Sequence, residues 1–341
     1  MHGNVTLGIS CYRQAELVAS LVESLHASLL PGDEVLIADD GSGEADVAVL
    51  RGLCERFDAV RLIEGVPTGR AASNRNRLIA AARGDFLITV DGDDALKPGW
   101  RRALSDALSS TPNADVVFFD YELVSSAGTS EQVSALRARG LYEHLVQLRR
   151  GGSGDVHALD ARGLQRLALT HSSPLHTVNC IVRKQTLVAL GLAWDERFRV
   201  AEDTDFFLRL LRCPRVVYVD RTLGQYRIGE QGLTKTVRLE SDLARVVQRQ
   251  SMWLEAVRFG QLDDSVWEHL SWRTADAEMA LAYHLRTFGE PRKARSMVVR
   301  ALAAGIDRPK LIELVKSVIA QLMPRQGQDF TEHYWPRRTE K

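Results

Sequence analysis

The stretch Phe86-Leu87-Ile88-Thr89-Val90-Asp91-Gly92-Asp93-Asp94 decides how the rest of this sequence is interpreted. Five apolar or β-branched residues in a row predict a buried parallel strand. The strand ends on three carboxylates, and ligands of open α/β sheets bind outside the carboxyl ends of the strands. A divalent cation such as Mg²⁺ or Mn²⁺, which prefers oxygen ligands, would relieve the repulsion between these carboxylates. The alternative interpretation is a solvated acidic turn.

The composition is that of an ordinary globular protein. The 341 residues suit one large or two modest domains, and 45% of them are hydrophobic. Lysine plus arginine balance aspartate plus glutamate at 44 each, so no basic footprint points to nucleic acid. No signal peptide precedes the first predicted strand, and no apolar run approaches the ~20 residues that span a bilayer. We therefore expect a cytoplasmic protein whose four scattered cysteines are reduced, mostly buried thiols.

Predicted strands alternate with predicted helices in the first part of the chain. The strands are 5–10, 34–38, 60–63 and 86–90, and the helices between them are about 16–29, 45–57 and 70–83. This alternation indicates right-handed βαβ units and a mostly parallel sheet. The first strand is not followed by GxGxxG, and the chain has no GxxxxGK[ST], which disfavours a dinucleotide oxidoreductase and a P-loop kinase.

A second acidic cluster, Glu202-Asp203-Thr204-Asp205, begins a predicted helix. Acidic side chains at a helix N-terminus contribute about 0.3–1 kcal/mol each, so helix capping is an alternative to a catalytic role. Before it, strand 115–121 leads into segment 124–154, whose serines, glycines and arginines predict a flexible loop on the substrate side. A further strand is predicted at 216–219.

The pattern changes near residue 238, where strands give way to amphipathic segments. Helices are predicted at 239–259, 265–286, 291–304 and 309–322. We therefore expect two domains, residues 1–237 of α/β class and an all-helical domain of residues 238–341. The helical domain would serve self-association or acceptor binding. The aromatic and basic tail His333–Arg338 is interpreted as a frayed terminus in preference to a patch that touches a membrane.

Five motifs in this order resemble those of the inverting "family 2" glycosyltransferases with the GT-A fold. They are Ser10-Cys11-Tyr12, Asp39-Asp40-Gly41-Ser42, Arg75-Asn76, Asp91-Gly92-Asp93-Asp94 and Glu202-Asp203. The resemblance covers about residues 4–235. It implies a metal-dependent enzyme that moves a sugar from a nucleotide-sugar donor, expected to be a UDP-sugar. The acceptor would be a hydroxyl of a glycan, a polymer or a lipid-linked carbohydrate, and peripheral membrane contact would fit the last of these.

The resemblance also implies which residues hold the donor. Ser10 and Tyr12 would contact the nucleotide, with Tyr12 stacking near the base, although a buried tyrosine at a strand end explains it equally well. Asp40 would accept a hydrogen bond from the base. Arg75 would face the base or the diphosphate, with an exposed helical arginine as the alternative.

The two acidic motifs would carry the metal and the base. Asp93 would ligate Mn²⁺ or Mg²⁺ directly, and Asp91 would hold the ribose or a water of the metal, while Asp94 shares that role. Such a metal neutralises the charge that builds on the leaving nucleoside diphosphate. Asp203 would be the general base that deprotonates the acceptor hydroxyl, and Glu202 would orient it or the acceptor.

One departure from the family concerns the diphosphate. Where many relatives carry Y-R-x-H-x-x-S, this chain has Gly229 and Gly232 in place of the histidine and the serine. Arg227 or Lys235 would contact the diphosphate instead. Alternatively, the loop that contains Gly229 and Gly232 would order only when substrate binds, or the metal would have one protein ligand fewer than in those relatives.

Three other classes of protein compete with this interpretation. A haloacid-dehalogenase-type phosphatase also places D-x-D after a strand, but it requires D-x-D-x-[TV], and Ala95 follows Asp94 here. A non-catalytic module that binds sugar nucleotides would not need carboxylates at both the metal and the base positions. A sugar-1-phosphate nucleotidyltransferase would need a glycine-rich, basic N-terminal loop, which this sequence lacks.

Overall fold

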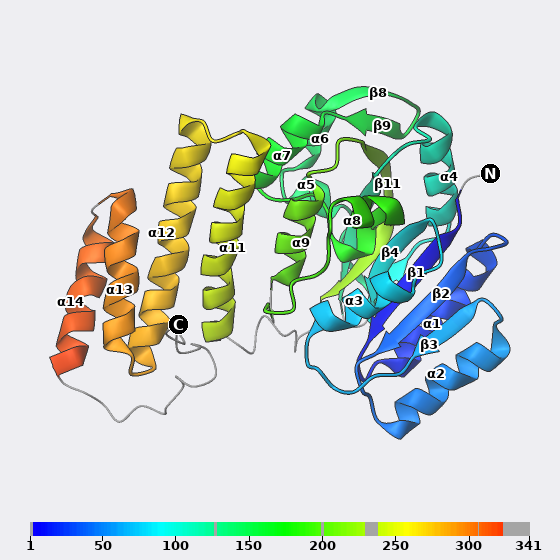
Figure 1. Ribbon diagram of the computed structural model, residues 1–341, viewed down its shortest axis with the longest axis horizontal. Helices are drawn as coiled ribbons and strands as arrows, with labels where there is room; N and C mark the ends of the chain where they lie inside the picture. The colour runs from blue at the N-terminus through cyan, green and yellow to red at the C-terminus, as the bar shows by residue number, and fades with distance from the viewer. Residues whose placement is uncertain (1–2, 126–127, 199–200, 229–237, 306, 323–341) are drawn as a thin grey trace. The chain divides into compact units, whose positions relative to one another are not determined.

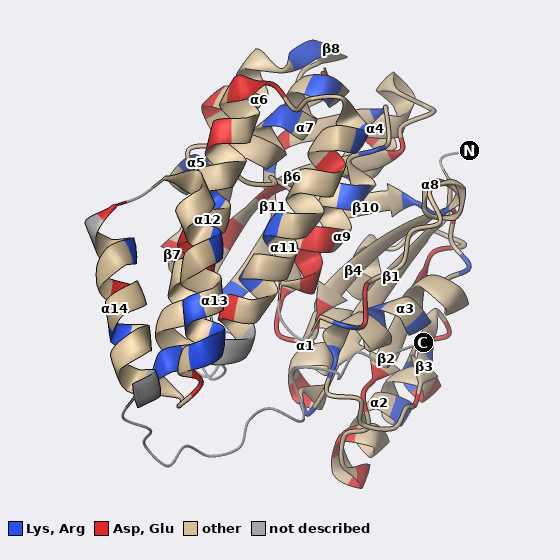
Figure 2. Ribbon diagram, turned by 60° about the vertical axis from the view of Figure 1, so that its left-hand side comes forward, with Lys and Arg blue, Asp and Glu red and all other residues tan. Residues whose placement is uncertain are grey.

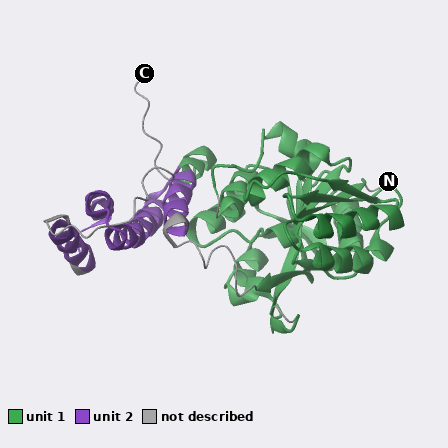
Figure 3. Cartoon of the chain, turned by 90° about the horizontal axis from the view of Figure 1, so that it is seen from below, with its two compact units in different colours: residues 1–233, 254–261 green, residues 234–253, 262–341 purple. Residues whose placement is uncertain are grey.

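The computed structural model describes residues 3–125, 128–198, 201–228, 238–305 and 307–322 (Figure 1). The chain forms two compact units (Figure 3). Unit 1 comprises residues 1–233 together with 254–261, and unit 2 comprises residues 234–253 together with 262–341.

A single mixed sheet forms the centre of unit 1, and its path runs β3-β2-β1-β4-β10-β6-β11-β9-β8. In that order the strands are β3 (Val60–Ile63), β2 (Glu34–Asp39), β1 (Val5–Cys11), β4 (Phe86–Asp91), β10 (Cys180–Arg183), β6 (Val116–Ser125), β11 (Val216–Ile228), β9 (Val156–Leu159) and β8 (Arg149–Ser153), with β5 (Ala95–Leu96) beside β11 and β7 (Ser130–Gln132) beside β6.

The predicted βαβ alternation is confirmed in the first part of this sheet. Strands β1, β2, β3 and β4 pair in parallel, and helices connect them. The strand that ends on the acidic motif, β4, is parallel to β1 on one side and antiparallel to β10 on the other, so the sheet is mostly but not wholly parallel. The helices of unit 1 are α1 (Ala15–Leu25), η1 (His26–Ser28), α2 (Glu44–Arg56), α3 (Ala71–Ala81), α4 (Trp100–Ser110), α5 (Ala135–Ala138), α6 (Tyr142–Gln147), α7 (Ala161–Thr170), η2 (Thr177–Asn179), α8 (Lys184–Ala189) and α9 (Glu202–Leu210).

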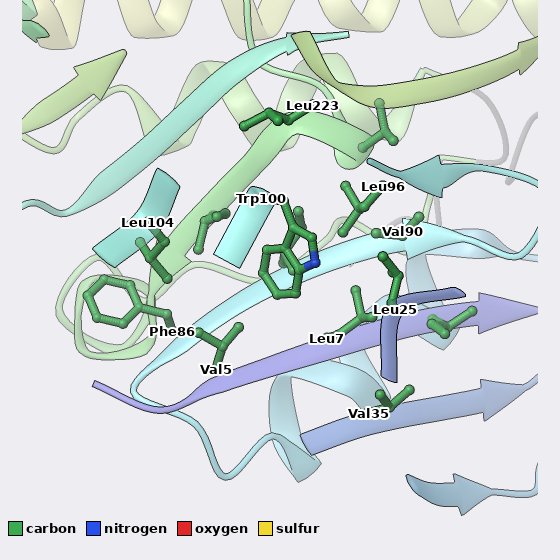
Figure 4. Packing of buried hydrophobic residues seen from close by; sticks show 14 of the residues in the cluster. Val5, Leu7, Leu25, Val35, Phe86, Val90, Leu96, Trp100, Leu104 and Leu223 are labelled. Atoms are coloured by element: carbon green, nitrogen blue, oxygen red, sulfur yellow. The ribbon is translucent and has the colours of Figure 1, made fainter. Parts of the chain in front are cut away.

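The central strands are buried on both faces, as their runs of apolar and β-branched residues predict. All of Phe86–Val90 and all of β2 are buried. Figure 4 shows how Val5 and Leu7 of β1, Phe86 of β4 and Trp100 of α4 pack in one cluster. Burial of a large apolar side chain stabilises a fold by about 1.5–3 kcal/mol. The cluster therefore fixes the strands whose ends carry the acidic motif.

The prediction of a flexible loop at 124–154 was wrong for the residues that the structure describes. This segment contains the end of β6, then β7, α5, α6 and β8. The side chain of Asp120 on β6 accepts hydrogen bonds from the hydroxyl of Ser134 and, at 3.1 Å, from the amide of Leu136, which folds the segment back onto the strand. Gly151, Gly152 and Gly154 belong to the β8–β9 hairpin, where Gly152 has a φ of 137°. These contacts are long-range, so local composition could not predict them.

The last strand is also longer than its sequence pattern indicates. Strand β11 extends from Val216 to Ile228 rather than ending at residue 219, and it pairs with β6 over this length through two shifts in register. Its central residues, Asp220 and Arg221, are polar. They interrupt the apolar pattern without interrupting the pairing.

The described part of unit 2 is helical, as the sequence predicts. Helix α11 (Arg238–Phe259) passes from unit 2 into unit 1, and α12 (Asp264–Thr287), α13 (Pro291–Ala301), η3 (Leu302–Ala304) and α14 (Arg308–Leu322) follow. A small apolar core, which includes Val246, Leu281 and Met297, holds these helices together. Asp263 caps α12 by accepting hydrogen bonds from the amides of the helix's first turn.

None of the helices in the described ranges is both long and apolar enough to cross a membrane. All four cysteines are free thiols, and Cys11, Cys180 and Cys213 are buried while Cys54 is partly exposed. The tail at 333–338, together with Gly229, Gly232 and Lys235, lies outside the described residues.

Candidate active site

The carboxyl ends of β1, β2 and β4 bring the N-terminal motifs to one edge of the sheet. Ser10 lies beside Asp91 in the pairing of β1 with β4, and Cys11 lies beside Asp39 in the pairing of β1 with β2. Gly92 follows β4 and donates a backbone hydrogen bond to the carbonyl of Ser10 at 2.8 Å. A Cβ atom at Gly92 would lie 2.8 Å from the side chain of Gln14, so the glycine of the acidic motif permits this close approach.

Arg75 joins the two acidic motifs. Its Nη2 donates to both carboxylate oxygens of Asp91, at 2.8 and 2.9 Å, and its Nη1 donates to Oε1 of Glu202 at 2.7 Å. The arginine side chain is only 5% exposed. Burial alone would lower the pKa of Arg75, but the two carboxylates outweigh it and hold that pKa above its ordinary value. The guanidinium is therefore a fixed positive charge between the two motifs.

The arginine is held in place by an aromatic stack that the sequence analysis missed. Its guanidinium carbon lies 4.6 Å from the ring centroid of Trp194. The Trp194 ring in turn stacks on Phe206 of α9, with centroids 4.0 Å apart and planes 2° from parallel. Asn76, the residue after Arg75, bonds the backbone of Trp194 through both its amide nitrogen and its amide oxygen, at 2.9 and 2.8 Å. The pair Arg75-Asn76 therefore attaches helix α3 to helix α9.

Glu202 and Asp203 form the first turn of α9, which Figure 2 shows with acidic residues in red. The preceding residue, Ala201, has a φ of 63°, a conformation that costs a non-glycine residue about 1–2 kcal/mol. Burial raises the pKa of Glu202, and the Arg75 guanidinium opposes that shift. Asp203 is partly exposed, and its Oδ1 accepts a hydrogen bond from the amide of Thr204 at 2.7 Å.

Asp93 and Asp94 carry charge that their surroundings do not fully compensate. Burial, with repulsion from Asp91, raises the pKa of Asp93, and the pKa of Asp94 is raised well above its ordinary value by burial and by both other carboxylates. Oδ1 of Asp94 accepts the amide hydrogen of Arg227 at 3.0 Å, whereas its buried Oδ2 has no hydrogen-bond partner among the residues that the structure describes. The Nε of Arg227 also donates to the backbone carbonyl of Asp93 at 2.9 Å.

These carboxylates fit a divalent cation that takes most of its ligands from a substrate. Over the described residues, no group of three histidine, cysteine, aspartate or glutamate side chains could enclose a metal ion. Mg²⁺ in particular is usually bound through one or two carboxylates plus phosphate oxygens. Asp93, with its raised pKa, and the unpartnered oxygen of Asp94 match that donor set. The oxygens of Asp91 already accept from Arg75, although each carboxylate oxygen retains a further lone pair.

The predicted nucleotide contacts lie at the ends of β1 and β2. Tyr12 is 45% exposed, and the guanidinium of Arg13 lies 5.0 Å from its ring centroid, so it is not the buried tyrosine of the alternative interpretation. Asp40 is buried and accepts hydrogen bonds from the amide and hydroxyl of Thr68 and from the amide of Gly69. Both oxygens of Asp40 therefore already organise the loop before α3, and its predicted contact with a base stays a prediction.

The hydroxyl of Ser10 accepts a hydrogen bond from Asn74 at 3.0 Å. The two arginines near Arg75 on the sequence also have structural partners. Arg77 donates to the carbonyls of Asp39 and Ile63, and Arg70 donates to that of Glu196. Arg75 differs from both because its partners are the carboxylates of the two acidic motifs. Its predicted contact with the donor remains untested.

Three aromatic residues near the acidic motifs were not found from the sequence. His176 stacks on Tyr121 with ring centroids 5.2 Å apart, and it meets Tyr226 edge-on at 4.8 Å. Burial raises the pKa of Tyr226 to about 12, and the pKa values of Tyr121, His176 and Tyr226 all respond to the charge of Asp203. Tyr226 is the tyrosine of the run that corresponds to Y-R-x-H-x-x-S, but no motif marks Tyr121 or His176, which meet Tyr226 only in the fold.

One family profile and several curated proteins match this chain. The profile described as "Glycosyl transferase family 2" matches residues 6–157. The uncharacterized glycosyltransferase EpsJ of Bacillus subtilis is 24% identical over 235 residues, which are 68% of this chain and 63% of that protein. The succinoglycan biosynthesis protein ExoO of Rhizobium meliloti is also 24% identical, over 70% of this chain and 64% of that protein. The matches thus span less than two thirds of the length of these two relatives.

Solved structures show the same fold. The S. aureus TarS 1–349 structure in complex with UDP-GlcNAc superposes with a TM-score of 0.58 at 13% identity, and covers 94% of this chain and 92% of that one. The mannosyltransferase PcManGT from Pyrobaculum calidifontis, in complex with GDP-Man and Mn²⁺, superposes with a TM-score of 0.54 at 16% identity, over 94% of this chain and 88% of that one.

Proposed function

We propose that this chain, whose residues 6–157 match the glycosyl transferase family 2 profile, catalyses metal-dependent, inverting transfer of a sugar from a nucleotide-sugar donor to an acceptor hydroxyl. The observation that carries this proposal is the bridge made by Arg75, which contacts Asp91 of the first acidic motif and Glu202 of the second. A reaction centre for a single displacement needs the donor's leaving group and the acceptor's base on opposite sides of one carbon atom. Two acidic motifs held together by one buried charge support that arrangement.

Asp203 would act as the general base on the acceptor. The attacking hydroxyl must lose its proton as it approaches the anomeric carbon, and a positioned carboxylate that accepts it contributes about 10²–10⁴-fold in rate. Asp203 is partly exposed, whereas its neighbour Glu202 is ion-paired with Arg75. Glu202 would therefore position the first turn of α9 rather than accept the proton itself.

Asp93 and Asp91, with Asp94, would hold Mn²⁺ or Mg²⁺ beside the diphosphate. Such an ion, when bound, supplies positive charge that stabilises the leaving nucleoside diphosphate. Arg227, whose Nε donates to the backbone of Asp93, would add a protein charge at the same place. Ser10, Tyr12 and Asp40 would contact the nucleoside.

We propose a UDP-sugar as the donor and a glycan, polymer or lipid-linked carbohydrate as the acceptor. The TarS structure holds UDP-GlcNAc, and ExoO is named for succinoglycan biosynthesis, which supports a UDP-sugar and a polysaccharide product. PcManGT holds GDP-Man with Mn²⁺, so GDP-sugars are the competing donors.

A thermal-shift panel tests the donor site directly. UDP, GDP, dTDP and CDP are each added with and without Mn²⁺ to wild type and to Asp93→Asn. A ligand at ~100 times its dissociation constant adds about 2.7 kcal/mol to the free energy of unfolding. We expect UDP to stabilise wild type only with Mn²⁺, and to lose that effect in Asp93→Asn but not in the control Asp106→Asn on the exposed side of α4. Stabilisation by no nucleotide would contradict the proposal.

An assay of nucleotide release separates transfer from the alternatives. A non-catalytic module would bind the donor without releasing UDP when acceptors are supplied. The match to glycosyl transferase family 2 favours a transferase over a haloacid-dehalogenase-type phosphatase, which would instead release inorganic phosphate from a phosphate ester.

We propose that unit 2, which contains most of the predicted domain 238–341, mediates self-association. Its last described helix, α14, buries Glu313 and Ser317 but leaves an apolar stripe exposed, which supports a contact beyond the chain. The stripe consists of Leu311, Ile312, Val315, Val318 and Ile319. Light scattering of wild type and Val315→Glu tests this role. If wild type and Val315→Glu are both monomers, self-association is contradicted. If wild type binds vesicles or an acceptor and Val315→Glu does not, the stripe is assigned to a membrane or an acceptor instead.

A further inference from the structure

The ring of His176 is held rigidly by its own short helix. Its Nδ1 accepts the amide hydrogen of Val178 at 3.4 Å, while its backbone amide donates to Oδ1 of Asn179 at 2.7 Å. Asn179 is fully buried, and its Nδ2 donates to the carbonyl of Phe119 at 2.8 Å, which anchors η2 to strand β6. Because Nδ1 is an acceptor, the neutral ring carries its proton on Nε2.

Two tyrosines from adjacent parallel strands enclose this ring. Tyr121 of β6 stacks on one face of His176, and Tyr226 of β11 meets it edge-on. Gly224 lies beside Tyr121 in the pairing of these strands. A Cβ atom at 224 would lie 2.8 Å from the Cβ of Tyr121 and 2.9 Å from the carbonyl of Val178, so the glycine is what allows η2 to approach the sheet here. We call Tyr121, His176 and Tyr226 the aromatic wall.

The aromatic wall lies next to the first acidic motif, because the backbone amide of Arg227, the residue after Tyr226, donates to Oδ1 of Asp94 at 3.0 Å. Burial lowers the pKa of His176, and the carboxylates of Asp203 and Asp91 oppose that shift while Arg75 and Arg139 add to it. His176 as a residue is nevertheless partly exposed. Its neutral ring, with Nδ1 already bonded, can donate a hydrogen bond through Nε2–H to a bound molecule.

We propose that the aromatic wall lines the subsite of the transferred sugar and that Nε2–H of His176 donates a hydrogen bond to one of its hydroxyl groups. This inference rests on the proposed function, because the sugar must lie between the diphosphate near Asp93 and the base Asp203. Sugar sites combine an apolar surface with a few placed polar groups, which tyrosine rings and one imidazole N–H provide. A site built to bond a hydroxyl also rejects analogues that lack it in the right place, so His176 determines specificity.

Calorimetric titrations in Mn²⁺ measure the contribution of the sugar. UDP is compared with UDP-glucose, UDP-galactose and UDP-N-acetylglucosamine, and GDP with GDP-mannose, on wild type, His176→Phe and His176→Gln. The ratio of the two affinities, sugar nucleotide against bare nucleotide, isolates binding of the sugar. We expect His176→Phe to reduce this ratio about ten-fold for the preferred sugar, equivalent to about 1.4 kcal/mol, and to leave affinity for the bare nucleotide unchanged.

His176→Gln keeps an N–H donor and should recover part of the ratio. The exposed His171→Phe is the matched control and should change neither affinity. If His176→Phe does not fold, His176→Met takes its place, and its affinity ratio is compared with that of His176→Gln. Three outcomes would overturn this inference without touching the proposed function. The affinities for nucleotide and sugar nucleotide could fall equally in His176→Phe, neither affinity could fall, or wild type could bind no sugar nucleotide more tightly than the bare nucleotide. A wild type that binds no nucleotide would instead contradict the proposed function.

Discussion

Nη2 of Arg75 lies 2.8 and 2.9 Å from the two carboxylate oxygens of Asp91, and this contact fixes helix α3 to the end of strand β4. The remaining Nη1 reaches Glu202 at the start of α9. One residue thus sets the distance between the motif assigned to the donor and the motif assigned to the base. Its burial makes the contact strong, because a buried ion pair that loses one partner leaves an uncompensated charge.

Arg75→Met should therefore destabilise the protein by about 3–5 kcal/mol, as measured by urea denaturation. The loss arises because Asp91 and Glu202 would face each other without a positive charge between them. Arg51→Met is the matched control, since Arg51 also joins two carboxylates, those of Glu44 and Glu64, but in an exposed position. Exposed pairs contribute little, so we expect little change there. Similar effects of the two substitutions would contradict the role of Arg75.

Asp203→Asn should lower kcat by about 10²–10⁴-fold and leave the affinity for UDP with Mn²⁺ unchanged. The amide cannot accept the acceptor's proton, but it preserves the shape of the first turn of α9. Glu202→Gln should affect kcat less, because Glu202 is expected to position that turn through Arg75. An Asp203→Asn enzyme with wild-type kcat would mean that the aspartate only caps the helix.

Asp94→Asn should stabilise the metal-free protein at pH 7 and lose this advantage toward pH 4. Burial, with Asp91 and Asp93 nearby, raises the pKa of the Asp94 carboxyl in the folded state. A group whose pKa is higher when folded stabilises the fold below its unfolded pKa, and that contribution is lost as the pH rises through the folded pKa. The asparagine Oδ1 can still accept from the amide of Arg227.

Denaturation at several pH values in the presence of a chelator measures this difference. Asp106→Asn, an exposed substitution on α4, provides the control and should give a difference that stays flat with pH. A stability difference for Asp94→Asn that grows toward pH 4 would contradict the assigned direction.

Ala201→Gly should stabilise the protein by about 0.5–1 kcal/mol. Ala201 precedes the acidic turn with a φ of 63°, a conformation that glycine adopts without the steric cost. Ala48→Gly, at an exposed position inside α2, should instead destabilise by about 1 kcal/mol because glycine is a poor helix former. Thermal denaturation of both variants tests the prediction, and loss of stability in Ala201→Gly would show that the backbone at 201 is not strained.

The class of fold and the order of the motifs follow from local patterns in the sequence. Uninterrupted apolar runs such as Phe86–Val90 are buried on both faces, and such runs alternating with amphipathic segments predict a mostly parallel sheet from local pattern alone. Because the carboxyl ends of parallel strands share one edge, Ser10 and Asp91 could be placed together before the structure was known. The helices of residues 238–322 follow equally from their periodicity.

What these motifs contact depends on the tertiary structure. Arg75 resembles the partly exposed Arg70 and Arg77 in sequence, and its burial depends on Trp194, a residue far along the chain, stacking on Phe206. The elements in 124–154 and the aromatic wall around His176 likewise depend on long-range pairings. Local propensity acts over a few residues, whereas a hydrogen bond or ring contact between distant segments depends on the packing of the whole domain. That is why the sequence identified the acidic residues and the fold identified what holds them.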